Sequence, residues 1–203
     1  MRGAIYIITD PDAPLPVAEQ ARAAARGGAT LIQIRDKHAP DADLAALVTL
    51  LMPEMTAAGV HLIVNDRVEV ALATRAHGLH IGQGDGDVVA IRRRMPPGMI
   101  LGLSVETEDQ ARRIPPGVDY IGAGPVRATA TKPDHAAPIG LEGLARIVAA
   151  AGLPAYAIGG LGPGDAAAVR ASGAVGMAVV SAVTRAADPT AATRALCAEW
   201  GAA

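Results

Sequence analysis

The chain has 203 residues, of which 51% are hydrophobic and 19% are charged, and its formal net charge is −2. This length fits a single domain, which we take to span residues 1–203, and so small a charge argues against a general attraction to nucleic acid or to an anionic membrane. A lone cysteine, Cys197, excludes an internal disulfide, and no apolar run reaches the roughly 18–20 residues of a membrane span. We therefore expect a soluble, cytoplasmic protein in which any phosphate is bound by a local site.

Short apolar runs recur along the sequence, and each is typical of a strand that is buried on both faces. In chain order they are Ala4–Thr9, Thr30–Ile34, Val60–Val64, Gly78–Ile81, Met99–Ser104, Val118–Gly122, Ala155–Ile158 and Gly176–Val180. Helical patterns follow them in turn at Pro16–Arg26, Asp41–Ala58, Arg67–Arg75, Asp87–Arg94, Glu106–Arg113, Leu141–Ala151, Pro163–Ser172 and Pro189–Trp200. Several of these patterns end at a glycine, as helices often do.

The repeated alternation of strand and helix predicts a parallel sheet. An open, doubly wound sheet would also alternate, but eight units without an edge strand favour closure into a (β/α)8 TIM barrel of the α/β class. In such barrels active sites form at the C-terminal ends of the strands. The longest irregular stretch, Gly124–Ile139, follows the sixth predicted strand, and a loop of that length in a compact domain is usually functional.

A cationic segment follows the second predicted strand. Gln33, Arg35 and Lys37 alternate with Ile34 and Asp36, so the first three side chains point to one side of an extended segment. On a solvent face they would form an ordinary exposed edge. Inside the barrel mouth, however, two cations would be costly without a bound anion, and we predict an anion site here.

Carboxylates follow the next two predicted strands. Asn65 and Asp66 come after the third strand, and Asp85 lies in the loop after the fourth. Each could instead cap the helix that comes next. Two carboxylates that converge with the phosphate oxygens of a substrate form a typical magnesium site, whereas no Cys/His spacing indicates zinc. Magnesium is therefore the expected cofactor.

A second anion site is predicted at the ends of the last two strands. Gly159-Gly160 ends the seventh and Val180-Ser181 ends the eighth. In many barrels the loops at these positions bind phosphate through backbone N–H groups, although a Gly-Gly pair also serves as a simple turn.

The long loop after the sixth strand adds Thr129, Thr131 and Lys132, which form either a solvated loop or a lid that closes over the barrel mouth. Ser104 ends the fifth strand, and His80 lies near the mouth, where a packed and a catalytic role both stay open. No pairing of a nucleophile with a base is evident, so covalent catalysis has no support.

Most of these residues belong to seven motifs that occur in order at six of the predicted strand ends. The motifs are Gln33-Ile34-Arg35-Asp36-Lys37, Asn65-Asp66-Arg67-Val68, His80-Ile81-Gly82-Gln83-x-Asp85, Gly122-x-Gly124-Pro125-Val126, Thr129-x-Thr131-Lys132, Ile158-Gly159-Gly160 and Val179-Val180-Ser181-Ala182. Each motif alone is weak. In this order, and over nearly the whole chain, they resemble the thiamine-phosphate synthase family.

The resemblance implies a reaction and a role for each matching residue. The family joins hydroxymethylpyrimidine diphosphate to thiazole phosphate, which gives thiamine phosphate and diphosphate. The pyrimidine diphosphate would be held by Gln33, Arg35, Lys37, Asn65, Ser104 and Lys132. Magnesium would be bound by Asp66 and Asp85. The thiazole phosphate would be held by Thr129, Thr131, Gly160, Val180 and Ser181. The catalytic set would be Arg35, Lys37, Ser104 and Lys132.

The chain departs from the family pattern at two places. Glu106 stands where the family often has histidine, and Arg127-Ala128 replaces the usual aromatic or proline-containing run before Thr129. The first departure puts any role of that position in doubt. The second bears on loop closure and on contacts with the thiazole.

The sequence leaves other functions open. A thiazole tautomerase of the same superfamily shares the fold but releases no diphosphate. Retention of Arg35, Lys37, Asp66, Asp85 and the Thr-x-Thr-Lys loop argues against it. A non-catalytic barrel that binds a phosphate ligand would tolerate loss of the two aspartates. A third alternative, some other barrel acting on phosphosugars, is left open by the phosphate site alone. The expected partners are small-molecule substrates, and a homo-oligomer is an open option.

Overall fold

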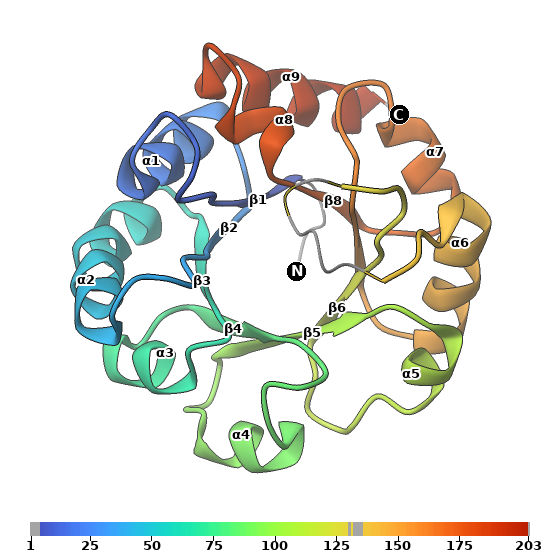
Figure 1. The fold of residues 1–203 in the computed structure, drawn as a ribbon, viewed down its shortest axis with the longest axis horizontal. Helices are drawn as coiled ribbons and strands as arrows, with labels where there is room; N and C mark the ends of the chain where they lie inside the picture. The colour runs from blue at the N-terminus through green and yellow to red at the C-terminus, as the bar shows by residue number, and fades with distance from the viewer. Residues whose placement is uncertain (1–4, 130, 132–135, 203) are drawn as a thin grey trace.

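A computed structural model describes residues 5–129, 131 and 136–202 of the chain. Within this part, parallel strands pair in chain order and close into a barrel, and helices surround them (Figure 1). The strands are β1 (Ile5–Ile8), β2 (Leu31–Ile34), β3 (His61–Asn65), β4 (Gly78–Ile81), β5 (Ile100–Val105), β6 (Tyr120–Ala123), β7 (Ala155–Ile158) and β8 (Gly176–Val179). The helices are α1 (Val17–Gly27), α2 (Asp41–Ala57), α3 (Val68–Thr74), α4 (Val88–Arg94), α5 (Glu108–Arg112), α6 (Gly140–Ala151), α7 (Ala166–Ala171), α8 (Ser181–Thr184) and α9 (Pro189–Ala202).

The predicted (β/α)8 TIM barrel is confirmed, and each predicted strand is present with its ends shifted by at most two residues. One helix was not predicted. The short helix α8 follows β8 directly and lies between β8 and α9 (Figure 1). Its sequence, Ser-Ala-Val-Thr, includes two β-branched residues, which have a lower helix propensity. Four positions are also too few to show a helical pattern.

The strands bury side chains on both faces, as their apolar runs predict. In β1, Ile5 and Ile7 pack outward in the layer between the sheet and the helices. Tyr6 and Ile8 point into the barrel, where a second apolar cluster fills the interior. Tyr120 and Tyr156 join Tyr6 there, and the ring centroids of the three tyrosines lie 5.4–6.0 Å apart in edge-to-face contacts.

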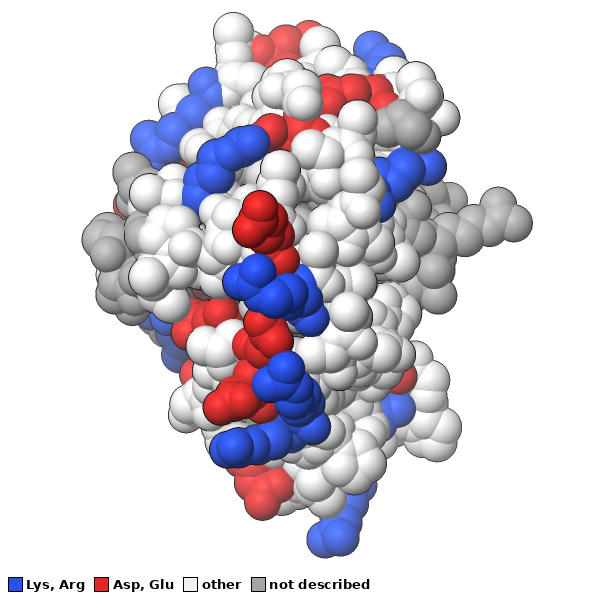
Figure 2. Space-filling model, turned by 90° about the vertical axis from the view of Figure 1, so that its right-hand side faces the viewer, with Lys and Arg blue, Asp and Glu red and all other residues white. Residues whose placement is uncertain are grey.

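The outer helices are linked by ion pairs. On the face that includes α5 and α6, acidic and basic side chains alternate in a stripe (Figure 2). Glu108 of α5 pairs with Arg112 of the same helix and with Arg146 of α6. Exposed pairs of this kind add little to stability, and opposite charges on the stripe largely cancel. Among the described residues, none of the helices combines the length and the apolar composition that crossing a membrane would require.

Candidate active site

A cavity of about 360 Å³ opens at the C-terminal ends of the strands. Its walls include every predicted site residue that the structure describes. These residues are Gln33, Arg35, Lys37, Asn65, Asp66, Asp85, Ser104, Thr129, Thr131, Gly160, Val180 and Ser181. The remaining predicted residue, Lys132, lies outside the described residues. Strand closure thus brings together groups that are up to about 150 positions apart in the chain.

The cationic wall comes from β2 and the segment that follows it. Gln33, Arg35 and Lys37 face the cavity, as their alternation predicts. The intervening Asp36 turns away, and its carboxylate accepts hydrogen bonds from the backbone N–H groups of residues 38 and 39. The backbone N–H of Arg35 donates to Thr9 Oγ1 at 3.0 Å, which ties this segment to the end of β1.

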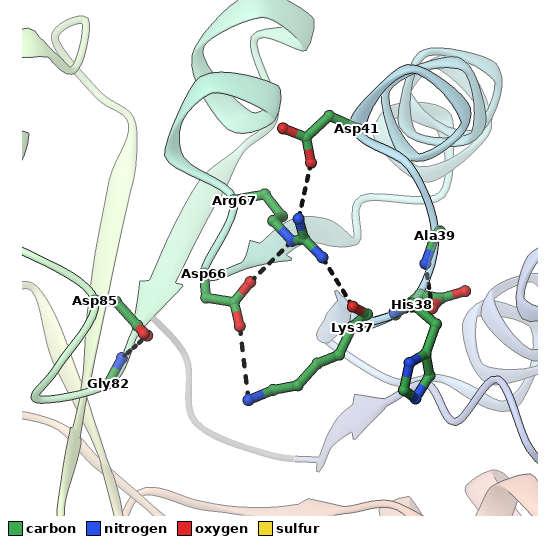
Figure 3. Close-up of polar contacts among 9 residues, drawn as sticks. Lys37, His38, Ala39, Asp41, Asp66, Arg67, Gly82 and Asp85 are labelled. Atoms are coloured by element: carbon green, nitrogen blue, oxygen red, sulfur yellow. Dashed lines mark hydrogen bonds and ion pairs between the residues drawn. The ribbon is translucent and has the colours of Figure 1, made fainter.

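Asp66 lies at the end of β3, beside two cations (Figure 3). Its carboxylate is 3.9 Å from Lys37 Nζ and 3.4 Å from Arg67 Nε. Arg67 also pairs with Asp41 and donates to the backbone carbonyl of Lys37, so it holds the loops after β2 and β3 together. The φ of Asp66 is +48°, a left-handed conformation that aspartate adopts more readily than most side chains.

The second carboxylate, Asp85, approaches the same region from the loop after β4. Burial, and then the charge of Asp85, raise the pKa of the Asp66 carboxyl despite its cationic neighbours. One oxygen of Asp85 accepts from the backbone N–H of Gly82 at 2.6 Å. The alternative capping roles are not seen, because Arg67 occupies the N-cap position of α3 and Asp87 caps α4.

This donor set fits a hard cation such as magnesium. Asp66 and Asp85 repel each other while both face the cavity, and a divalent cation would relieve that repulsion. Among the described residues, no group of three or more His, Cys, Asp or Glu side chains could hold a metal. The other oxygen ligands would therefore come from water or from a bound phosphate, which is the usual arrangement for magnesium.

The opposite wall is formed by the ends of β7 and β8. Gly159 and Gly160 both have positive φ, +102° and +63°. A Cβ atom at Gly160 would lie 2.8 Å from the carbonyl oxygen of Ala128, so the loop after β6 packs directly on this turn. Val180 and Ser181, at the start of α8, complete the wall.

The loop after β6 is fastened at its base to the turn after β7. The guanidinium of Arg127 makes a two-pronged ion pair with Asp165, with both N–O distances 2.8 Å, and also donates to the Gly160 carbonyl. The backbone N–H of Arg127 donates to the Gly159 carbonyl. The departure at Arg127 therefore has a structural consequence, because an aromatic residue there could not pair with Asp165. Glu106, the other departure, lines the cavity.

Below the cavity, predicted residues meet two tyrosines, Tyr6 and Tyr120, for which the sequence predicts no role. His80 is buried, and its ring nitrogens lie 3.0 Å from the Tyr120 hydroxyl and 3.0 Å from Ser104 Oγ. Tyr6 bonds Tyr120 at 2.8 Å, and Gln33 Nε2 donates to Tyr6 at 2.6 Å. Tyrosine among aliphatic residues at inward-facing strand positions was the available sequence signal for this floor.

Comparison with known proteins places the whole chain beside one family. Residues 5–183 match the profile of the family described as thiamine monophosphate synthase. Thiamine-phosphate synthase of Roseiflexus sp. (strain RS-1) is 49% identical over 96% of this chain and 84% of its own length. The corresponding protein of Moorella thermoacetica is 45% identical over 95% and 92%. The structure of thiamine phosphate pyrophosphorylase from Pyrococcus furiosus superposes with a TM-score of 0.86 at 37% identity, over 96% and 94%.

Proposed function

This chain belongs to the thiamine monophosphate synthase family, and we propose that it is the transferase that joins hydroxymethylpyrimidine diphosphate to hydroxyethylthiazole phosphate. The C–O bond between the pyrimidine methylene and the diphosphate breaks, and a C–N bond to the thiazole nitrogen forms. Thiamine phosphate and diphosphate are the products. The main support from the structure is one cavity with a cationic, carboxylate-bearing wall facing a glycine-rich wall.

The cationic wall suits the leaving group. Arg35 and Lys37 would neutralise charge that builds up on the diphosphate as the C–O bond lengthens. Asp66 and Asp85 would hold a magnesium ion, which supplies further positive charge to the same oxygens. Lys37 lies 3.9 Å from Asp66, close enough for both groups to meet one phosphate. The aminopyrimidine can stabilise a positive methylene carbon, so bond breaking can run ahead of attack and needs no protein nucleophile.

The glycine-rich wall suits the attacking substrate. Backbone N–H groups near Gly160 and Ser181 would bind the phosphate of the thiazole. Thr129 and Thr131 also line the cavity, and their hydroxyls would orient this substrate. Closure of the loop over the mouth would exclude water, which otherwise competes with the thiazole nitrogen for the electrophilic carbon.

The direct test is a product assay with the purified protein. We expect thiamine phosphate and diphosphate in equal amounts when both substrates and magnesium are present. Omitting either substrate, or chelating the metal, should remove the product. Binding of thiazole phosphate without any product would refute the proposal and favour a non-catalytic phosphate-binding barrel. Conversion of one thiazole isomer to another without diphosphate release would favour a tautomerase.

We place this reaction in the cytoplasm, a compartment in keeping with a single free cysteine. Cys197 is half-buried, and burial raises the pKa of its thiol, so it fits a packing role in α9.

A further inference from the structure

Four hydrogen bonds connect Gln33 on one side of the cavity floor to Ser104 on the other. Gln33 Nε2 donates to Tyr6 OH at 2.6 Å, and the hydroxyls of Tyr6 and Tyr120 are 2.8 Å apart. The Tyr120 hydroxyl is 3.0 Å from His80 Nδ1, and His80 Nε2 is 3.0 Å from Ser104 Oγ. Gln33 and Ser104 both line the cavity, so the chain begins and ends where a substrate would lie.

The four hydrogen bonds of this chain must all point the same way once the donor at one end is known. An amide nitrogen only donates, so Tyr6 accepts from Gln33 and keeps its single proton for Tyr120. Tyr120 in turn accepts from Tyr6 and donates to a ring nitrogen of His80. Burial raises the pKa of both Tyr6 and Tyr120, so the two phenols keep the protons that the chain requires.

The tautomer of His80 determines which atom donates in the hydrogen bond to Ser104. Tyr120 donates to Nδ1, and only a neutral imidazole has a ring nitrogen that can accept a hydrogen bond. A neutral ring that accepts at Nδ1 carries its proton on Nε2 and donates it to Ser104 Oγ. The serine hydroxyl has then accepted a hydrogen bond, and its own proton is available to the cavity. At the far end, Gln33 is left with its carbonyl oxygen as an acceptor.

We propose that Tyr6, Tyr120 and His80 are positioning residues that set Ser104 as a donor and Gln33 as an acceptor at the same time. The functional meaning rests on the proposed function, because an anionic diphosphate at Ser104 requires a donor. With the chain reversed, Ser104 would spend its proton on His80 and would present only lone pairs to the anion.

Two glycines, Gly102 and Gly122, leave space inside the barrel for this chain of hydrogen bonds. A Cβ atom at Gly102 of β5 would lie 2.2 Å from the Tyr120 ring and 2.4 Å from His80 Nδ1. A Cβ atom at Gly122 of β6 would lie 3.2 Å from His80 Cε1. A methyl group at Gly102 would therefore separate the two groups that meet at the middle of the chain. Tyr156 packs against the same rings, yet its buried hydroxyl has no hydrogen-bond partner among the described residues.

This difference between two neighbouring tyrosines provides a matched pair of variants. Tyr120→Phe removes a hydroxyl from the middle of the chain, whereas Tyr156→Phe removes one that lies outside it. We expect Tyr120→Phe to lower kcat by about tenfold, the size expected when one buried hydrogen bond is lost. Its KM for thiazole phosphate should stay unchanged, because Ser104 and Gln33 lie on the pyrimidine side. Tyr156→Phe should stay within about twofold of the unaltered protein in kcat. Equal kcat values for the two folded variants would overturn the proposal.

The direction of the chain can be measured without turnover. ¹⁵N NMR of histidine-labelled protein, with His80 assigned through its loss in His80→Asn, reports which ring nitrogen carries the proton. We expect the Nε2–H form in the unaltered protein and in Tyr156→Phe, and a mixture of both forms in Tyr120→Phe. A proton on Nδ1 in the unaltered protein would refute the assigned direction. If the protein made no thiamine phosphate, the proposed function would fail, and this measurement would still decide the direction of the chain.

Discussion

Acid should unfold this protein in part through His80. Its ring is buried and hydrogen-bonded on both nitrogens, and burial lowers its pKa from 6.5 to about 4. In the unfolded chain the ring takes up a proton below about pH 6.5, whereas in the folded protein it stays neutral until about pH 4. The unfolded state therefore binds more protons between these values, and the free energy of unfolding falls as the pH is lowered.

The size of the effect follows from the two pKa values. Between pH 7.5 and pH 5.0 the contribution of His80 to the free energy of unfolding should fall by about 2 kcal/mol. Burial also lowers the pKa of His61 and of His77, so these rings act in the same direction and add to the total. Comparison with His80→Asn separates the contribution of His80, because the other two rings are common to both proteins.

Urea unfolding at the two pH values measures this difference. The fluorescence of the single tryptophan, Trp200, is a suitable probe because its side chain is buried in α9. The unaltered protein, free of metal and substrate, should lose about 2 kcal/mol more than His80→Asn between pH 7.5 and 5.0. Equal losses in the two proteins would show that His80 is protonated in the folded state at pH 5.0, and would refute the reasoning.

Three further predictions concern the metal site, the loop and the barrel. Asp85→Asn should lower magnesium-dependent turnover at least about tenfold and leave the urea midpoint unchanged. The control, Asp109→Asn at an exposed position, should change neither. Parallel loss of stability and activity in Asp85→Asn would indicate a structural role. Arg127→Ala should raise the KM for thiazole phosphate several-fold, and Arg127→Lys should recover only part of the loss because lysine cannot form the two-pronged contact; an unchanged KM would contradict this. Gly124→Ala should lower the free energy of unfolding in urea by about 2–3 kcal/mol, because its Cβ would lie 2.1 Å from a β7 carbonyl oxygen. Gly201→Ala has open space around its Cβ and should be neutral. Similar urea midpoints for the two alanine variants would contradict this.

Much of the fold could be predicted from the order of the residues. Runs of Ile, Val and Leu, each followed by a helical pattern, require a parallel sheet covered on both faces, and the number of repeats favours a closed barrel. Alternation within an extended segment was enough to predict that Gln33, Arg35 and Lys37 share one side, because the side-chain period of a strand is two. These are local properties, so one sequence suffices to predict them.

Competing roles of neighbouring polar residues could not be separated in this way. Asp85 and Asp87 both precede α4, and either could have capped it. Only the path of the backbone shows that Asp87 caps the helix while Asp85 lines the cavity. In the sequence, Arg127 is likewise only a departure from the family pattern. Its partner Asp165 lies in the loop after a different strand, so only the structure shows the pair.

The order of the residues thus encodes the alternation of strands and helices, the preference for a closed barrel and the strand ends at which polar side chains gather. Which of those side chains touch depends on the packing of the whole barrel. Strand closure places Tyr6 of β1 against Tyr120 of β6, and β4 beside β5, so that His80 reaches Ser104. Such contacts depend on register and on the space left by Gly102. They follow from how the whole barrel packs, which no local pattern encodes.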